Sequence, residues 1–193
     1  RERFRNYKEL SNIYINFRKQ LNKHKKKFFL IAVSGGPDSL ALAALSKAYS
    51  YEKKCKFYYV LVDHKIRKNS SKEAKSVKIL LKKHNITLNI LKNKNPIVKN
   101  VQSKAREVRY NLILNFCKKN KINTILTAHN LEDQVETFFI RLSRGSGLHG
   151  LSSMKQVNRI NKNINLVRPL LDFKKIKLIK IAKVIFGKFF SDP

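Results

Sequence analysis

The sequence predicts an α/β fold, a doubly wound parallel sheet with helices on both faces. Apolar segments of strand length alternate with segments of helix length, the pattern of βαβ units joined by right-handed crossovers. The predicted strands are FFLIAV (28–33), FYYVLV (57–62), ITLNIL (86–91) and TILTA (124–128). With 193 residues and 42% hydrophobic content, the chain is long enough for one principal domain with a real core.

A helix is expected after each of these strands, near residues 39–48, 71–84, 100–119 and 131–142. Residues 1–27 carry apolar side chains at helical spacing and are predicted to form a leading helix that packs on the sheet. After Gly150 the alternation weakens to a polar stretch up to Asn163, a short strand-like INLV and a helix-like run at 176–190. We treat 151–193 as a C-terminal extension of the 28–150 core.

The turn between the first strand and its helix reads SGGPDS and comprises Ser34, Gly35, Gly36, Pro37, Asp38 and Ser39. A glycine turn that enters a helix presents backbone N–H groups and the positive end of the helix dipole to an anion such as phosphate. It is not a Walker loop, because Pro37 and Asp38 stand where Lys and Ser or Thr are needed, and adjacent glycines exclude the dinucleotide fingerprint. The alternative is a plain turn in which Pro37 and Asp38 only favour the helix start.

Other unusual residues also follow strand ends, where ligands bind in such sheets at the point of strand-order reversal. DHKIR (63–67) follows the second strand, and HNLEDQ (129–134) follows the fourth. If the first and fourth strands are neighbours, the carboxylates of Glu132, Asp133 and Glu136 face the SGGPDS turn. Asp38 and Asp133 could then hold Mg²⁺ against a phosphate, although dipole stabilisation of the helix start would also explain the acidic cluster.

The chain is strongly basic, with 43 Lys plus Arg against 12 Asp plus Glu and a net charge of +31. This charge makes nucleic acid the leading class of partner, unless it reflects only a lysine-rich genome. Arg106 and Arg109 on the 100–119 helix, with Arg141 and Arg144 at the exit of the 131–142 helix, are candidates for phosphate contacts. Core-edge ion pairs for the first two and helix capping at RGSG are the competing interpretations.

The two cysteines, Cys55 and Cys117, have no zinc-site spacing and are expected to be reduced thiols. His64 and His129 lack metal-ligand spacing to a partner. No apolar run is long enough to span a membrane and no signal peptide opens the chain, so we expect a cytoplasmic protein that does not bind membranes.

Taken together, the motifs resemble the PP-loop ATP pyrophosphatases, whose SGGxDS turn binds ATP. Within that superfamily they resemble the tRNA(Ile)-lysidine synthetase family over residues 28–193. The motifs that carry this resemblance, in order, are VDHKIRKNS (62–70), QSKAREVRY (102–110), AHNLEDQVET (128–137), RLSRGSGLHGL (141–151) and RPLL (168–171). One departure is Glu132, where the family usually has a first aspartate before Asp133 and the glutamine.

The resemblance implies an adenine nucleotide alpha hydrolase-like fold and a ligase that forms a carbon–nitrogen bond. Cytidine O2 at the wobble position of isoleucine tRNA attacks ATP, pyrophosphate leaves, and the amine of L-lysine then displaces AMP. Ser34 to Ser39 would bind ATP, Asp38 and Asp133 would be catalytic with Mg²⁺, and the four arginines would contact tRNA or substrate. The family's later tRNA-binding domains are absent from this sequence, and a homodimer is compatible with it. A PP-loop tRNA thiolase and a non-catalytic ATP- or RNA-binding module are the alternatives.

Overall fold

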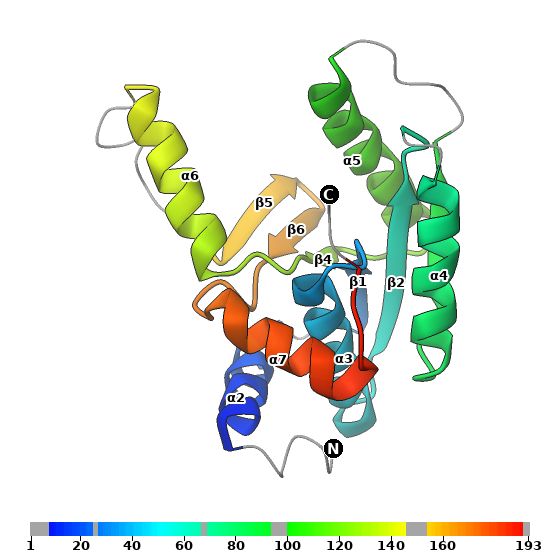
Figure 1. Ribbon diagram of the computed structural model, residues 1–193, viewed down its shortest axis with the longest axis vertical. Coiled ribbons are helices and arrows are strands. Elements are labelled where there is room, and N and C mark those ends of the chain that lie inside the picture. The colour runs from blue at the N-terminus through cyan, green and yellow to red at the C-terminus, as the bar shows by residue number, and fades with distance from the viewer. Residues whose placement is uncertain (1–7, 25–26, 67–68, 94–99, 146–153, 191–193) are drawn as a thin grey trace.

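The computed structural model describes residues 8–24, 27–66, 69–93, 100–145 and 154–190. Its described strands form a single sheet in the order β3-β2-β1-β4-β6-β5 (Figure 1). β1 to β4 and β6 are mutually parallel, which confirms the predicted doubly wound α/β fold. The strands are β1 (Phe28–Ala32), β2 (Lys56–Asp63), β3 (Leu88–Lys92), β4 (Thr124–Leu126), β5 (Val157–Asn161) and β6 (Ile164–Val167).

The edge strand β5 runs antiparallel to β6 and lies in the stretch that sequence analysis read only as polar. β5 is almost wholly exposed, so it carries no apolar signal. Its direction is set by a tight turn in which Asn161 Oδ1 accepts hydrogen bonds from the N–H groups of Asn163 (2.9 Å) and Ile164 (3.0 Å). The C-terminal extension therefore belongs to the same sheet as the core.

Helices cover both faces of the sheet. Side chains alternate along each strand, so apolar side chains point to both faces and each face needs a cover. Phe29 and Ile31 of β1 point into a core shared with α2, α3, α4 and α7, whereas Leu30 points into a second core against α5. The helices on the first face are α2 (Lys8–Asn22), α3 (Pro37–Glu52), α4 (Ser70–Lys82) and α7 (Lys175–Phe186); α5 (Val101–Lys119) covers the second. The predicted leading helix corresponds to α2, whose residues Leu10, Ile13, Phe17 and Leu21 are fully or almost fully buried.

The last helix is shorter than the 176–190 run that the sequence predicts. α7 stops at Gly187, which adopts a left-handed φ of +74° that glycine accepts without strain. The chain then turns back over the sheet, and the N–H of Phe190 donates to the carbonyl of Gly35 at 3.0 Å. This contact joins the far end of the described chain to the turn after β1.

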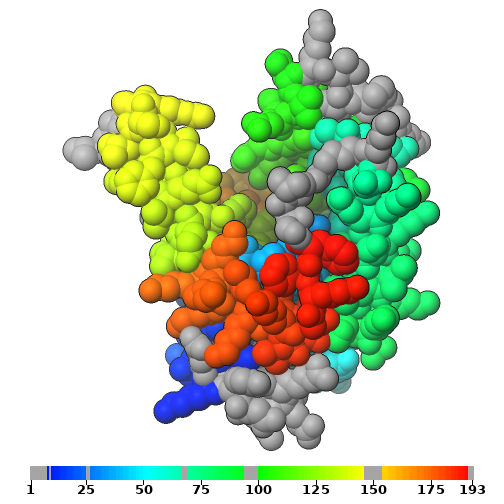
Figure 2. Space-filling view, viewed as in Figure 1, coloured from blue at the N-terminus to red at the C-terminus, as the bar shows by residue number. Residues whose placement is uncertain are grey.

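α6 (Leu131–Ser143) stands away from the body of the molecule and has no fully buried residue. In the space-filling view an open cleft separates α6 from α5 (Figure 2). The floor of this cleft is the carboxyl edge of the sheet. The SGGPDS and HNLEDQ motifs lie at this edge, after β1 and β4. No helix among the described residues has the length and hydropathy needed to cross a membrane.

Candidate active site

The site lies where the order of the strands reverses. β1 pairs with β4, so the turn after β1 and the turn after β4 are adjacent at the carboxyl edge of the sheet. The first of these turns is Ser34–Ser39 and the second leads into α6. The first and fourth predicted strands are therefore neighbours, which is the arrangement that brings the two turns face to face. In an open α/β sheet this is the position at which ligands bind.

The Ser34–Ser39 turn is organised by the Ser39 hydroxyl. Ser39 Oγ accepts from the N–H groups of Ser34 (3.2 Å) and Gly35 (3.1 Å) and from Ser34 Oγ (3.1 Å), and it donates to the carbonyl of Gly36 (2.9 Å). The N–H of Gly36 donates to Ser34 Oγ at 3.3 Å. The serine side chains thus hold the backbone donors of the turn in place, and an anion would compete with hydroxyl groups for them.

The start of α3 is open to an anion. Its N-cap residue is Gly36, which has no side chain to cap the helix, and Pro37 at the first helical position has no N–H. The first-turn N–H groups that remain belong to Asp38 and Ser39. Because the helix dipole adds positive potential at this point, the end of α3 can stabilise a phosphate above the turn.

Asp38 is a half-buried carboxylate at this helix start. Burial raises its pKa to about 6, the ammonium group of Lys175 lowers it, and the negative charges of Asp133 and Glu132 raise it. Its Oδ1 is buried and makes no hydrogen bond of ordinary geometry among the described residues, although the side chain of Asn130 lies near enough to lower the pKa. A carboxylate that is desolvated and next to other carboxylates gains stability from a cation placed between them.

The carboxylates of α6 differ in what they do. Asp133 Oδ2 accepts from the N–H of Asn130 at 2.9 Å, and the N–H of Asp133 donates to Asn130 Oδ1 at 3.1 Å, which is a capping box. Glu132 Oε2 accepts from the N–H of Lys175 at 2.8 Å and so caps the start of α7. One oxygen of Asp133 is therefore structural, and Glu132 ties α6 to α7.

Several basic side chains lie on the side of the cleft opposite the carboxylates. Arg109 Nε donates to His64 Nε2 at 3.3 Å, so His64 is a neutral acceptor here, and burial followed by the Arg109 charge lowers its pKa. Burial, then the charges of Arg168 and Arg106, lowers the pKa of His129. Arg106 also lies over the ring of Tyr110, with the guanidinium carbon 5.7 Å from the ring centroid. α5 thus brings Arg106 and Arg109 to the site.

Arg141 and Arg144 lie elsewhere. They are in the last turn and at the C-cap of α6, respectively, whereas Asp133 is in its first turn. At ~1.5 Å per residue, Arg144 is roughly 16 Å along the helix from Asp133. The structure therefore separates the four candidate arginines into a pair on the α5 side of the cleft and a pair at the outer end of α6. The glycines after Gly145 in RGSGLHGL, and Arg67 of DHKIR, lie outside the described residues.

Buried polar atoms without partners concentrate at this edge of the sheet. Among the described residues, Oδ1 of Asp38, Nδ2 of Asn130, Oε1 of Gln134, Nδ1 of His64 and Nε of Arg168 are all buried and lack a hydrogen bond. Asp38 lies in the first turn of α3 and Gln134 in the first turns of α6, whereas Asn130, His64 and Arg168 follow the ends of β4, β2 and β6. Such atoms are costly to bury, so their gathering at one place indicates a polar ligand.

Sequence reasoning missed three residues of this site. Lys175 was one lysine among many, and nothing in its local sequence distinguishes it. Arg168 belongs to the RPLL motif, and its local sequence predicts no role for it; its Nη1 donates to the carbonyl of Lys155 at 2.8 Å, and its buried Nε makes no hydrogen bond. Asn130 could have been found, because Asn followed three residues later by an acidic residue is a helix-start signature.

Comparisons with known proteins show the family of this chain. The sequence profile of the PP-loop domain family matches residues 9–193. The tRNA(Ile)-lysidine synthase of Orientia tsutsugamushi is 39% identical over 84% of this chain and 37% of its own length. The enzyme of the same name from Rickettsia typhi is 35% identical over 93% of this chain and 43% of its own length. The chain thus spans less than half the length of these curated relatives.

Solved structures share the fold. The U34-tRNA thiolase NcsA from Methanococcus maripaludis superposes with a TM-score of 0.81 at 18% identity, covering 96% of this chain and 67% of that one. The NH3-dependent NAD synthetase of Campylobacter jejuni gives a TM-score of 0.54 at 16% identity, covering 91% of this chain and 71% of that one. At these identities the likeness is one of fold.

Proposed function

Since the chain belongs to the PP-loop domain family, we propose that the cleft between the Ser34–Ser39 turn and α6 binds ATP and directs attack on its α-phosphorus. In the intact gene product the attacking group is O2 of the wobble cytidine of isoleucine tRNA. The bond from the α-phosphorus to the bridging oxygen breaks, and pyrophosphate leaves. The amine of L-lysine then attacks carbon 2 of the base, loses a proton, and displaces AMP.

The observation that carries this proposal is the gathering of unpartnered buried polar atoms at the carboxyl edge, beside an uncapped helix start. The N–H groups of Asp38 and Ser39 supply donors for the departing pyrophosphate, and the Arg106 and Arg109 guanidinium groups supply charge from the other wall. The choice of cytidine and lysine is supported by the relatives named tRNA(Ile)-lysidine synthase.

Mg²⁺ fits the acidic side of the cleft. The described residues contain no cluster of three or more His, Cys, Asp or Glu side chains that could hold a metal ion. Mg²⁺, however, usually takes one or two carboxylates and otherwise phosphate oxygens and water. The unpartnered Oδ1 of Asp38 is the leading protein ligand, and the free part of the Asp133 carboxylate is the second. Bound there, Mg²⁺ would neutralise charge on the phosphates. The Asp133 carboxylate could alternatively orient the amine of lysine.

The cysteines disfavour the thiolase alternative. Cys55 immediately precedes β2, and Cys117 lies near the end of α5, so both are at the amino edge of the sheet, opposite the cleft. Burial raises the pKa of Cys55, and it raises the pKa of Cys117 to about 12, which leaves both as unreactive thiols. Neither can deliver sulfur to a nucleotide held above the Ser34–Ser39 turn.

The test is to incubate the intact gene product with radiolabelled L-lysine, ATP, Mg²⁺ and an isoleucine tRNA transcript with a wobble cytidine. We expect label in the tRNA with the wild type, loss of label with Asp38→Asn, and retention with Glu73→Gln. Glu73 is exposed on α4, so the control removes the same charge away from the cleft. Label that stays free with the wild type would overturn the proposal; ATP and tRNA binding without pyrophosphate release would indicate a non-catalytic binding module.

A further inference from the structure

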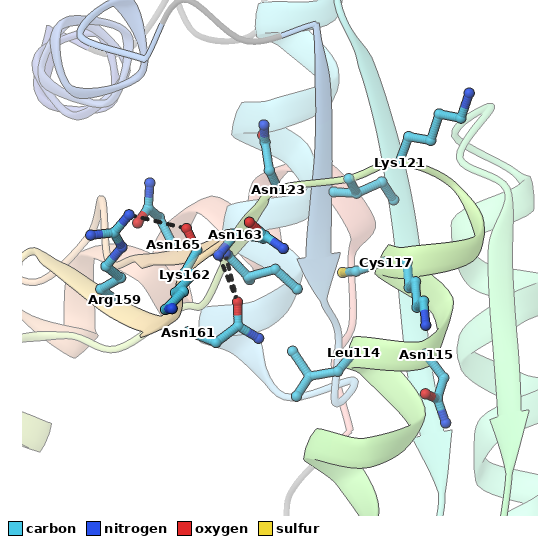
Figure 3. A pocket seen from close by; sticks show the side chains of 13 residues that line it. Leu114, Asn115, Cys117, Lys121, Asn123, Arg159, Asn161, Lys162, Asn163 and Asn165 are labelled. Atoms are coloured by element: carbon cyan, nitrogen blue, oxygen red, sulfur yellow. Dashed lines mark hydrogen bonds between the residues drawn. The ribbon is translucent and has the colours of Figure 1, made fainter.

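A second hollow lies at the opposite edge of the sheet from the cleft. It has a volume of about 1040 Å³ and is bordered by the last turns of α5, the turn that precedes β4, and the β5–β6 hairpin. Figure 3 shows hairpin side chains on one side and α5 side chains on the other. Because β4 enters the sheet at Thr124 and leaves it at Leu126, this hollow and the active-site cleft are separated by the length of the strands.

The lining of the hollow is cationic and rich in amides. It contains four cations, five asparagines and no carboxylate; these polar residues are Lys118, Lys121, Arg159, Lys162, Asn115, Asn123, Asn161, Asn163 and Asn165. The chain has no Asp or Glu between Glu107 and Glu132, or between Glu136 and Asp172, so both walls are free of acidic residues. The remaining lining is apolar and includes Leu114, Ile122 and Ile164.

One of the cations, the guanidinium of Arg159, is held in place by the hairpin. Arg159 Nη2 donates to the carbonyl of Lys162 at 3.0 Å, which orients the guanidinium across the turn. The same turn is closed by Asn161 Oδ1, which accepts from the N–H groups of Asn163 and Ile164. The hairpin therefore presents positive charge from a fixed backbone, and less side-chain entropy is lost on binding than from a mobile loop.

Lys121 occupies a backbone conformation that suits glycine better. Its φ of +54° follows the end of α5, where the N–H of Ile122 donates to the carbonyl of Cys117 at 2.9 Å. A non-glycine residue in this left-handed region costs about 1 kcal/mol or more, and Gly or Asn is the usual choice. Here the chain places a lysine, and its side chain lines the hollow.

We propose that this hollow binds the phosphodiester backbone of RNA, at a part of the tRNA distant from the nucleotide held in the active-site cleft. Lysine and arginine pair with phosphates; asparagine amides both donate to and accept from 2′-hydroxyl groups and base edges; and the apolar floor suits a ribose or a base face. The inference rests on the proposed function, because it takes the RNA to be the tRNA substrate.

The test compares two triple variants of the intact gene product with the same change in charge. Lys118→Gln/Lys121→Gln/Lys162→Gln removes three cations from the hollow, and Lys75→Gln/Lys78→Gln/Lys82→Gln removes three exposed cations from α4. Filter binding of the tRNA transcript is measured at several salt concentrations. We expect the hollow variant to bind about tenfold more weakly at 0.1 M salt and to lower the salt slope by about 2, with changes of under about twofold and under about 1 for the α4 variant.

Equal losses in the two variants, or no loss in either, would overturn the proposal, because binding would then reflect overall charge or another surface. The lysine-transfer assay separates this outcome from failure of the proposed function. Wild-type lysine transfer with an unaffected hollow variant refutes the RNA site and leaves the function intact. Loss of tRNA binding in the hollow variant, with no lysine transfer by the wild type, supports the RNA site and refutes the function.

Discussion

The two adjacent glycines of the SGGPDS turn should respond very differently to the same substitution. Gly35 has a φ of +100°, and a Cβ added to it would lie 2.7 Å from Cγ2 of Val77 and 3.5 Å from Cδ2 of Phe190. Gly36 has an ordinary φ of −67°, and its Cβ would meet only Ser34 Oγ at 3.5 Å and the carbonyl of Phe190 at 3.9 Å. Of these two residues, only Gly35 must be glycine for the turn to keep its conformation.

The magnitude for Gly35→Ala follows from two separate costs. A non-glycine residue in this backbone region costs about 1–3 kcal/mol, and overpacking against buried Val77 costs about 1–3 kcal/mol more. A total of about 4 kcal/mol, the middle of the summed range, lowers the melting temperature by roughly 8–16 °C for a domain of this size. Gly36→Ala should stay within about 1 kcal/mol, or roughly 3 °C.

Thermal and urea unfolding, followed by far-ultraviolet circular dichroism, measure this difference. The clash with Val77 is tested by a double-mutant cycle: Gly35→Ala should cost about 1 kcal/mol less in a Val77→Ala background, because the overlapping methyl group is gone. Equal destabilisation by the two glycine substitutions, or full additivity with Val77→Ala, would refute the reasoning. If Gly36→Ala keeps its stability but loses ATP affinity, Gly36 is needed for the approach of the phosphates.

Three further predictions concern the acidic side of the cleft. The pKa of Asp38 is raised from 3.8 to about 6, so its contribution to stability is fully present below pH 3.8 and lost as the pH rises through about 6. At neutral pH and without ligand, Asp38→Asn should therefore be about 1–2 kcal/mol more stable than the wild type after allowance for solvent screening, with the difference gone near pH 3.8; a less stable variant in unfolding titrations would contradict this. Glu132→Ala removes the cap on the Lys175 N–H and should cost about 1 kcal/mol, with pyrophosphate release at saturating substrates nearly unchanged; a large loss of that turnover would make Glu132 catalytic. Asn130→Ala breaks the capping box and should cost about 1–2 kcal/mol in unfolding experiments, whereas Asn130→Ser, which keeps an acceptor oxygen, should cost less than half of that; equal costs would contradict the capping role.

Much of the fold could be predicted from the sequence, because its central strands are buried on both faces. Segments such as 28–33 and 57–62 are nearly continuous apolar runs, and glycine or acidic residues mark their ends. The sequence could not predict that β1 and β4 are neighbours, since strand order depends on long-range packing. β5 could not be found at all, because an exposed edge strand of VNRIN has no apolar side to reveal it.

The candidate site was predictable in part for the same kind of reason. Asp38 and the Ser34–Ser39 turn depend on local sequence, and so does the helix start at Asp133. The contact of Glu132 with the N–H of Lys175 joins residues 43 positions apart, and the amino end of α7 lies beside α6 only after the sheet has formed. The positions of Lys175, Arg168 and the hollow at the amino edge likewise depend on tertiary structure, so no local sequence pattern predicts them.

The most direct test of the central claim is to trap the adenylated tRNA. The intact gene product is incubated with ATP radiolabelled at its α-phosphate, Mg²⁺ and the isoleucine tRNA transcript, first without L-lysine and then with it. We predict label on the tRNA in the absence of lysine, its release as AMP when lysine is added, and no label on the tRNA with Asp38→Asn. Label that never joins the tRNA, or that joins it equally with Asp38→Asn, would contradict the assignment of the cleft as the adenylating site.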